Sequence, residues 1–144
     1  MKKNILIIGL GKVGFSFDKL LPEKLYILTH SRAFYLHPNF NIIAGVDKSS
    51  INRNEFSKIY NCKAYSNIKK ALLDNKVDVV VIATPTTTHL KVIKELFIYS
   101  SPSVIICEKP LAYNLKDSKS IISLCKKNNS NLFVNYMRNS SLAI

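Results

Sequence analysis

The first fourteen residues place an apolar run directly before a glycine-rich turn. Residues 4–14 read NILIIGLGKVG, in which Gly9, Gly11 and Gly14 fill the three glycine positions of a G-x-G-x-x-G pattern. A buried strand that enters such a turn and continues into a helix is the arrangement that holds a dinucleotide pyrophosphate. Gly9 permits the tight turn, Gly11 lets the backbone approach the phosphates, and Gly14 lets helix and strand pack closely. This order predicts a parallel α/β fold.

The residues between the second and third glycines complete the predicted phosphate site. Lys12 and Val13 stand at the expected start of a helix, where backbone N–H groups are free and the helix dipole favours negative charge. The glycine pattern alone is weak, because many junctions between a strand and a helix contain glycine. The apolar strand in front of it makes the prediction more specific.

Length and composition fit one globular domain. The chain has 144 residues, of which 47% are hydrophobic and 21% charged, values typical of a folded domain with a single core. No apolar run approaches the length of a membrane-spanning helix, and no signal-peptide cleavage pattern follows the N-terminus. We therefore expect no membrane partner and a cytoplasmic location.

A net charge of +12 can indicate nucleic-acid binding, but the distribution of the basic residues argues against it here. The basic residues are spread along the chain and are not interleaved with aromatic residues that could stack on bases. We expect no nucleic-acid partner, and a field that favours an anionic dinucleotide. Cys62, Cys107 and Cys125 have no C-x-x-C spacing, so they predict reduced thiols and no metal site.

Apolar runs alternate with helix-like segments along the whole chain. After the first run, strands are expected at residues 41–46, 63–65, 78–83, 103–107 and 131–135. Helices are expected at residues 12–21, 29–36, 52–60, 67–73, 87–99 and 114–127. The side chains expected to face the core are Phe56, Ile59, Leu90, Ile93, Leu96, Phe97, Ile121, Ile122, Leu124 and Cys125. This alternation predicts a right-handed, doubly wound parallel sheet in one domain, residues 1–144.

An acidic residue follows the second expected strand. Asp47 is placed to accept hydrogen bonds from the adenosine ribose hydroxyls and to repel a 2′-phosphate, which favours NAD. Lys48, Ser49 and Arg53 come next and could instead hold that phosphate, so NADP stays open; Asp47 could also be only a turn or helix-cap residue. Asp47 lies 33 positions after Gly14, against about 20 in the simple pattern. Residues 15–29 therefore predict an extra loop or helix.

Two further clusters follow strands. Thr84, Pro85 and His89 lie in the sequence ATPTTTH after residues 78–83, where the loop faces the crevice at the carboxyl ends of the strands. Their hydroxyl groups and fixed turn suit contact with the nicotinamide ribose. The threonines could equally cap the next helix, and a single histidine is more often a core or surface residue.

The second cluster is Glu108, Lys109 and Pro110, after residues 103–107. A lysine in a water-poor crevice can hydrogen-bond a substrate hydroxyl or assist proton transfer. Taken alone, E-K-P would more often be a surface ion pair before a turn.

Five segments together resemble one family: NILIIGLGKVG, GVD, VVIATPTTTH, CEKPL and VNYMR, in this order. They are similar to the N-terminal half of the Gfo/Idh/MocA oxidoreductases, the family of glucose-fructose oxidoreductase and inositol dehydrogenase. The resemblance covers nearly the whole chain, and the pairing of A-T-P-x-x-x-H with E-K-P is more specific than the glycine pattern. It implies a Rossmann domain that binds NAD or NADP and serves hydride transfer at a hydroxyl of a sugar, polyol or nucleotide sugar.

The resemblance also implies a role for each matched residue. The glycines match the phosphate turn, and Asp47 matches the ribose contact. The nicotinamide-side loop is matched by Thr84, Pro85 and His89. The signature in which Lys109 orients cofactor and substrate, as the catalytic residue, is matched by Glu108, Lys109 and Pro110. Asn135, Tyr136 and Arg138, in residues 130–144, resemble the segment that crosses to a C-terminal α+β domain, which is absent from this chain. The stretch His30 to Phe34, after the insertion, resembles a branch with an interrupted first helix.

Two functional hypotheses stay open from the sequence. In the first, the chain is the nucleotide-binding domain of an NAD(P)-dependent oxidoreductase, incomplete as an enzyme, whose full-length parent is an oligomer that acts on a sugar-like substrate. The domain itself would then be a monomer. In the second, it is a non-enzymatic dinucleotide-binding module, a sensor or a partner subunit. These residues do not identify the substrate.

Overall fold

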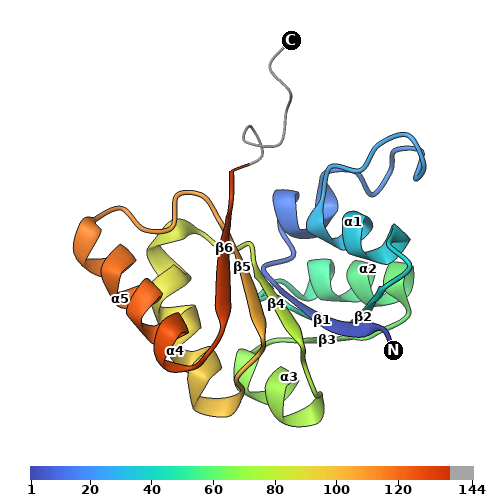
Figure 1. Cartoon of the computed structure of the whole chain (residues 1–144). Coiled ribbons are helices and arrows are strands. Elements are labelled where there is room, and N and C mark those ends of the chain that lie inside the picture. Colours follow the sequence, from blue (N-terminus) through green and yellow to red (C-terminus); the bar gives the residue numbers. More distant parts are fainter. Residues whose placement is uncertain (137–144) are drawn as a thin grey trace.

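The computed structural model describes residues 1–136, which form one six-stranded sheet covered by helices (Figure 1). All strands are parallel, in the order β3-β2-β1-β4-β5-β6. The strands are β1 (Lys3–Ile8), β2 (Phe40–Val46), β3 (Lys63–Tyr65), β4 (Val79–Ile82), β5 (Val104–Glu108) and β6 (Asn131–Asn135). The helices are η1 (Lys12–Ser16), α1 (His30–Leu36), α2 (Ser50–Tyr60), α3 (Ile68–Asp74), η2 (Thr86–Thr88), α4 (His89–Tyr99) and α5 (Leu115–Lys127). The expected doubly wound α/β fold is confirmed.

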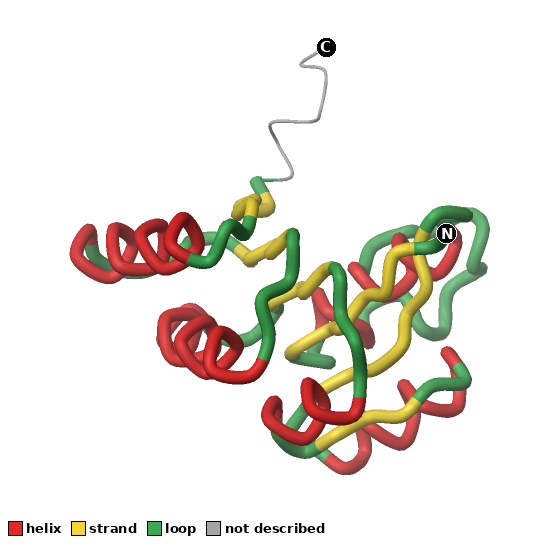
Figure 2. The backbone as a smooth tube through the Cα atoms, turned by 60° about the horizontal axis from the view of Figure 1, so that its bottom comes forward, coloured by secondary structure: helices red, strands yellow, loops and turns green. Residues whose placement is uncertain are grey.

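The central strands are buried on both faces, which is why their sequences are continuously apolar. In β1, Leu6 and Ile8 join the core beneath α3, α4 and α5, whereas Ile5 and Ile7 join the core beneath η1 and α2. Figures 1 and 2 show these two groups of helices on opposite sides of the twisted sheet. None of the helices described is both long and apolar enough to cross a membrane.

Four helices begin where the sequence offers a polar cap. The side chains of Thr29, Ser49, Asn67 and Asn114 each accept a hydrogen bond from a backbone N–H in the first turn. Such bonds satisfy amide groups that have no partner inside the helix. These caps explain why the expected starts near residues 29, 67 and 114 agree with the structure within one residue.

Two residues that were expected in the core lie just beside the buried face of their helix, so these predictions were wrong. Ile59 and Ile122 are 46% and 42% exposed, although both were expected to face the core. In α2, Phe56 and Tyr60 are four residues apart and pack against Phe15 instead. Residues four apart share a helix face, and the large aromatic rings fill the space that Ile59 would need.

The helix expected at residues 12–21 was also wrong. Only a single π-helical turn, η1, forms, and the chain then runs through a long loop to α1 (Figure 2). The cause is a tertiary contact: the buried Asp18 carboxylate accepts hydrogen bonds from the backbone N–H groups of Leu28 and Thr29. These bonds pull the chain back on itself and end the helix before Pro22 is reached.

Candidate functional site

The parallel sheet brings the predicted site residues to one edge. The carboxyl ends of β1, β2 and β4 adjoin, because Gly9 N–H donates to Val46 O at 2.8 Å and Ala83 N–H donates to Ile8 O at 2.8 Å. β5 lies next to β4 and ends at Glu108. The glycine turn, Asp47, the Thr84 loop and Glu108 therefore share the edge at which ligands bind in open α/β sheets.

The glycine turn is tightly packed at its first and third glycines. Gly9 has φ +95°, a left-handed conformation that favours glycine, and a Cβ there would lie 2.6 Å from the carbonyl of Ala83. A Cβ on Gly14 would collide with Gly9 O. Both positions therefore need glycine for the fold itself.

Gly11 differs from the other two glycines. It has φ −77° and ψ −157°, which any residue can adopt, and a Cβ there would have no protein atom within 4 Å. Nothing in the described protein requires glycine at this place, whereas a phosphate lying against the backbone would. The open space fits a pyrophosphate that contacts the N–H groups of Lys12 and Val13, since the first amides of a helical turn have no internal acceptor.

Asp47 already supports the turn. Its Oδ2 accepts from Leu10 N–H at 2.7 Å, and its Oδ1 accepts from Ser49 N–H at 2.8 Å. Each carboxylate oxygen can accept a second hydrogen bond, so ribose hydroxyls still find acceptors. Arg53 Nη1 donates to the carbonyl oxygens of Asp47 and Lys48 at 2.9 and 2.8 Å, which holds a guanidinium beside the same site.

His89 connects two loops of the site. Its imidazole is fully buried, with Nε2 2.9 Å from Thr84 O and Nδ1 3.1 Å from Leu111 O. The ring thus ties the loop after β4 to the loop after the E-K-P sequence. A direct contact of His89, Thr84 or Pro85 with a cofactor remains a prediction. Burial raises the pKa of the nearby Cys107 thiol to about 12, which keeps it protonated at neutral pH.

Glu108 is held by two side chains from distant elements. Its Oε1 lies 2.7 Å from His30 Nε2 and accepts from Asn135 Nδ2 at 2.6 Å. Burial alone would raise the pKa of Glu108, but the hydrogen bonds from His30 and Asn135, the charge of His30 and the Lys109 N–H together lower it below its ordinary value. Glu108 therefore joins α1, β5 and β6 as a carboxylate.

Lys109 and Pro110 follow Glu108 but are exposed. The described residues do not enclose the lysine in the water-poor crevice that was expected. Its catalytic role stays a prediction. Arg138, expected in the crossing segment, lies outside the described residues.

Sequence reasoning did not count His30 and Asn135 among the cofactor-site residues, although both lie at this edge. They line a cavity of about 410 Å³ whose other residues are Val13, Phe17, Ile27, Leu28, Thr29 and Ala33. No motif marks either residue, and His30 and Glu108 are 78 positions apart. Only their places in the resembling segments could have drawn attention to them.

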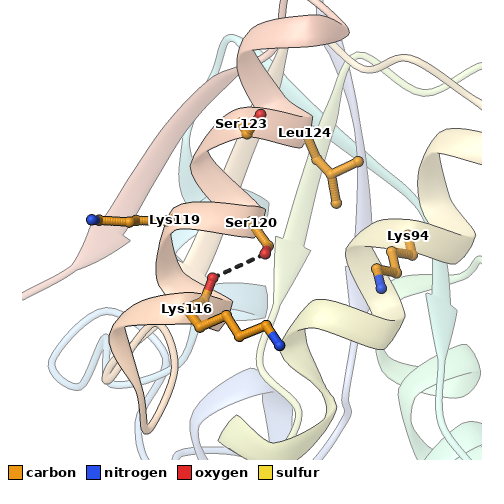
Figure 3. Close-up of a pocket in the computed structure, with 6 residues that line it drawn as sticks. All are labelled: Lys94, Lys116, Lys119, Ser120, Ser123 and Leu124. Carbon is orange, nitrogen blue, oxygen red and sulfur yellow. Dashed lines mark hydrogen bonds between the residues drawn. The ribbon is translucent and has the colours of Figure 1, made fainter.

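A second hollow, of about 540 Å³, lies between α4 and α5 (Figure 3). Its walls are Lys94, Lys116, Lys119, Ser120, Ser123 and Leu124, and Ser120 Oγ donates to Lys116 O at 2.9 Å. It contains none of the predicted site residues. Among the described residues, no cluster of three or more His, Cys, Asp or Glu side chains could hold a metal ion.

The lowered pKa of Glu108 has a consequence for stability. Because the unfolded chain binds protons at a higher pH than the folded one, Glu108 contributes stability that is complete above its ordinary pKa of 4.5 and is lost as the pH falls through the lowered folded value. We expect Glu108→Gln to be less stable than wild type at pH 7, by about 1–3 kcal/mol, with the difference shrinking below pH 4.5. Urea unfolding at several pH values measures this, and a pH-independent difference would contradict it.

The strand order 3-2-1-4-5-6, with a glycine turn after β1 and a carboxylate after β2, defines a dinucleotide-binding Rossmann domain. Residues 3–136 match the family described as "Oxidoreductase family, NAD-binding Rossmann fold", the Gfo/Idh/MocA family. The chain belongs to this family, which confirms the resemblance seen in the sequence.

Individual relatives agree with this assignment. The scyllo-inositol 2-dehydrogenase (NADP(+)) of Bacillus subtilis is 28% identical over 91 residues, which are 62% of this chain and 27% of the relative. Two solved structures share the fold. The myo-inositol 2-dehydrogenase of Lactobacillus plantarum has a TM-score of 0.77 at 19% identity, and the match covers 98% of this chain and 38% of the dehydrogenase chain. The WlbA dehydrogenase of Bordetella pertussis, in complex with NADH and UDP-GlcNAcA, has a TM-score of 0.73 at 17% identity. That match covers 92% of this chain and 34% of the WlbA chain.

The matches cover only part of each relative. For five curated relatives the matched share is between 18% and 27% of their length. The shared part is the dinucleotide-binding domain.

Proposed function

We propose that this chain supplies the cofactor site of an NAD(P)-dependent oxidoreductase that acts on a hydroxyl group of a sugar, a polyol or a nucleotide sugar. The observation that carries the proposal is the open space at Gly11, in line at one sheet edge with the Asp47 carboxylate and with Glu108. The substrate class is supported by the inositol dehydrogenases and the UDP-GlcNAcA complex among the similar proteins.

The site residues divide the binding of the dinucleotide among them. The N–H groups of Lys12 and Val13 hold the pyrophosphate beside Gly11, and the Asp47 carboxylate accepts from the adenosine ribose. The loop at Thr84 and Pro85, which His89 fixes from beneath, lies against the ribose of the nicotinamide half. The bound cofactor supplies hydride acceptance or donation at nicotinamide C4.

Lys109 is the residue of this chain to which we assign a part in the reaction. Its Nζ donates a hydrogen bond to the substrate hydroxyl oxygen and so orients it. A base from a substrate-binding domain, as the resemblance implies, shares the handling of the hydroxyl proton. Glu108, held by His30 and Asn135, fixes the backbone from which Lys109 projects.

Titration with NADH and NADPH tests the proposal directly. We expect saturable binding of at least one of them, seen in nicotinamide fluorescence and in calorimetry. Absence of saturable binding of both would overturn the assignment.

The choice between NAD and NADP depends on two neighbouring charges. We propose that Asp47 favours NAD, because its carboxylate repels a 2′-phosphate. Asp47→Ala is expected to weaken NADH binding about tenfold or more and NADPH binding less, a difference of more than about 1.4 kcal/mol for NADH. Arg53→Ala is the matched variant and should weaken NADPH more than NADH. The opposite ranking in calorimetric titrations would reverse the cofactor preference.

A dinucleotide-binding module without its own reaction is the second candidate, and the exposure of Lys109 favours it. Incubation with NAD⁺ and scyllo-inositol, followed at the NADH absorbance, tests the module. Turnover by the 144-residue chain would contradict the module.

We propose that this chain is a monomer in the cytoplasm and has no nucleic-acid partner. The free thiols of Cys62, Cys107 and Cys125 support a reducing compartment. Salt-dependent retention on DNA would contradict the expected partners.

A further inference from the structure

The segment between η1 and α1 is an ordered part of the molecule with its own internal contacts. Asp18, fully buried, accepts hydrogen bonds from Leu28 N–H, Thr29 N–H and Thr29 Oγ1 at 2.8 to 3.0 Å, and its Oδ1 lies 3.6 Å from Arg32 Nε. Arg32 Nη1 in turn donates to the carbonyl oxygens of Leu21 and Tyr26 at 3.1 and 2.9 Å. These contacts hold residues 17–29, which we call the inserted segment, in one shape.

The inserted segment carries apolar side chains that the fold leaves uncovered. Phe17, Ile27 and Leu28 are 60%, 51% and 47% exposed. All three line the cavity of about 410 Å³, together with Val13 of the glycine turn and Asn135 at the end of β6. A ligand pocket in a protein commonly has this size, mostly apolar walls and a few polar groups.

The position of the cavity favours one part of the dinucleotide as its occupant. In the sheet, β2 lies on one side of β1, whereas β4, β5 and β6 lie on the other. A dinucleotide with its adenosine ribose at Asp47 and its pyrophosphate at Gly11 must therefore extend its second half toward β4–β6. The cavity begins at Val13, beside that pyrophosphate position, and reaches Asn135 on β6, so it lies where the second half of the ligand arrives.

We propose that the inserted segment binds the nicotinamide ring of the dinucleotide against Phe17, Ile27 and Leu28. The inference deepens the proposed function and rests on it. The ring is planar and, in NADH, uncharged. Burying one of its faces against the apolar walls therefore stabilises the bound ligand. The amide of Asn135 and the ring of His30, at the polar side of the cavity, are placed near the carboxamide. One face of the nicotinamide is thereby shielded and the other is left for substrate.

The experiment compares two ligands that differ only in the presence of the nicotinamide. NADH and ADP-ribose share the adenosine and the pyrophosphate, so the ratio of their affinities isolates the nicotinamide contribution. For the wild-type chain we expect NADH to bind about tenfold more tightly or better, with enhanced nicotinamide fluorescence. In Ile27→Asn and Phe17→Ser the NADH affinity should fall to that of ADP-ribose, and the fluorescence enhancement should be lost.

The control variant lies in the same segment. Leu25→Asn changes a side chain that is 77% exposed and does not line the cavity, so its NADH affinity should equal that of wild type. Unchanged ADP-ribose affinity in every variant shows that the chain is folded. Equal binding of NADH and ADP-ribose by wild type, or an NADH affinity unaffected by both cavity variants, would overturn the inference alone. Failure of both ligands to bind would overturn the proposed function, and the inference with it.

Discussion

Gly11→Val is expected to weaken NADH binding by about a hundredfold or more while leaving the folded domain as stable as wild type. The backbone at Gly11 is extended, and a Cβ there meets no protein atom within 4 Å. Its stability should therefore change by less than about 0.5 kcal/mol, as for a surface substitution. The side chain would instead fill the space of the pyrophosphate. Thermal unfolding and NADH titration of the same sample measure both effects.

Gly14→Ala is the contrasting variant in the same turn. Its Cβ would collide with Gly9 O, a backbone atom that cannot move aside without disturbing β1. We expect destabilisation of about 3 kcal/mol or more, because overpacking against the backbone has no cheap relaxation. Wild-type NADH affinity in Gly11→Val would show that phosphates do not lie at this turn. Wild-type stability in Gly14→Ala would contradict the packing of the turn.

Asp18→Ala is expected to have the largest effect on stability, about 3–5 kcal/mol. The change removes one partner of a buried ion pair and leaves the Arg32 guanidinium, whose side chain is only 8% exposed, without its carboxylate. It also removes the acceptor of the Leu28 and Thr29 N–H groups. Chemical denaturation followed by circular dichroism measures the loss.

Glu23→Ala provides the matched control, since it removes a carboxylate from the same inserted segment at an exposed position. Its stability should stay within about 0.5 kcal/mol of wild type. Asp18→Asn should lie between the two, because the amide oxygen can still accept a hydrogen bond but carries no charge. A stability of Asp18→Ala within the range of the Glu23 variant would show that the Asp18 contacts do not hold the segment.

The strongest sequence predictions were those based on local patterns. Residues 78–83 predicted a central parallel strand, and β4 is that strand, buried on both faces. The helix starts expected at residues 29, 67 and 114 were right within one residue, and the structure shows a side-chain cap at each, which acts on amides only two or three positions away. Hydrophobic periodicity was less reliable for predicting which residues of a helix face the core. It could not distinguish Ile59 from Tyr60, because packing against Phe15 decides between them.

The site was predicted as a set of positions but not as a network. The glycine turn, Asp47 and Glu108 lie at one edge of the sheet, as the sequence predicted, because each follows an apolar strand and all such ends meet at one edge of a parallel sheet. Their part in binding a cofactor stays a prediction. The bonds of Glu108 to His30 and Asn135 were not found, since they join residues 78 and 27 positions apart. No local pattern reports a contact of that kind.

By themselves, the 144 residues determined the alternation of strands and helices, the parallel sheet and the place of the glycine turn, because each depends on interactions between near neighbours in the chain. The tertiary structure alone decided the course of the inserted segment. There a buried carboxylate finds its partners ten to fourteen residues later and ends a helix that local propensity favoured. It also decided which side chains face the cavity at Asn135, because that surface exists only once α1, the inserted segment and β6 have been brought together.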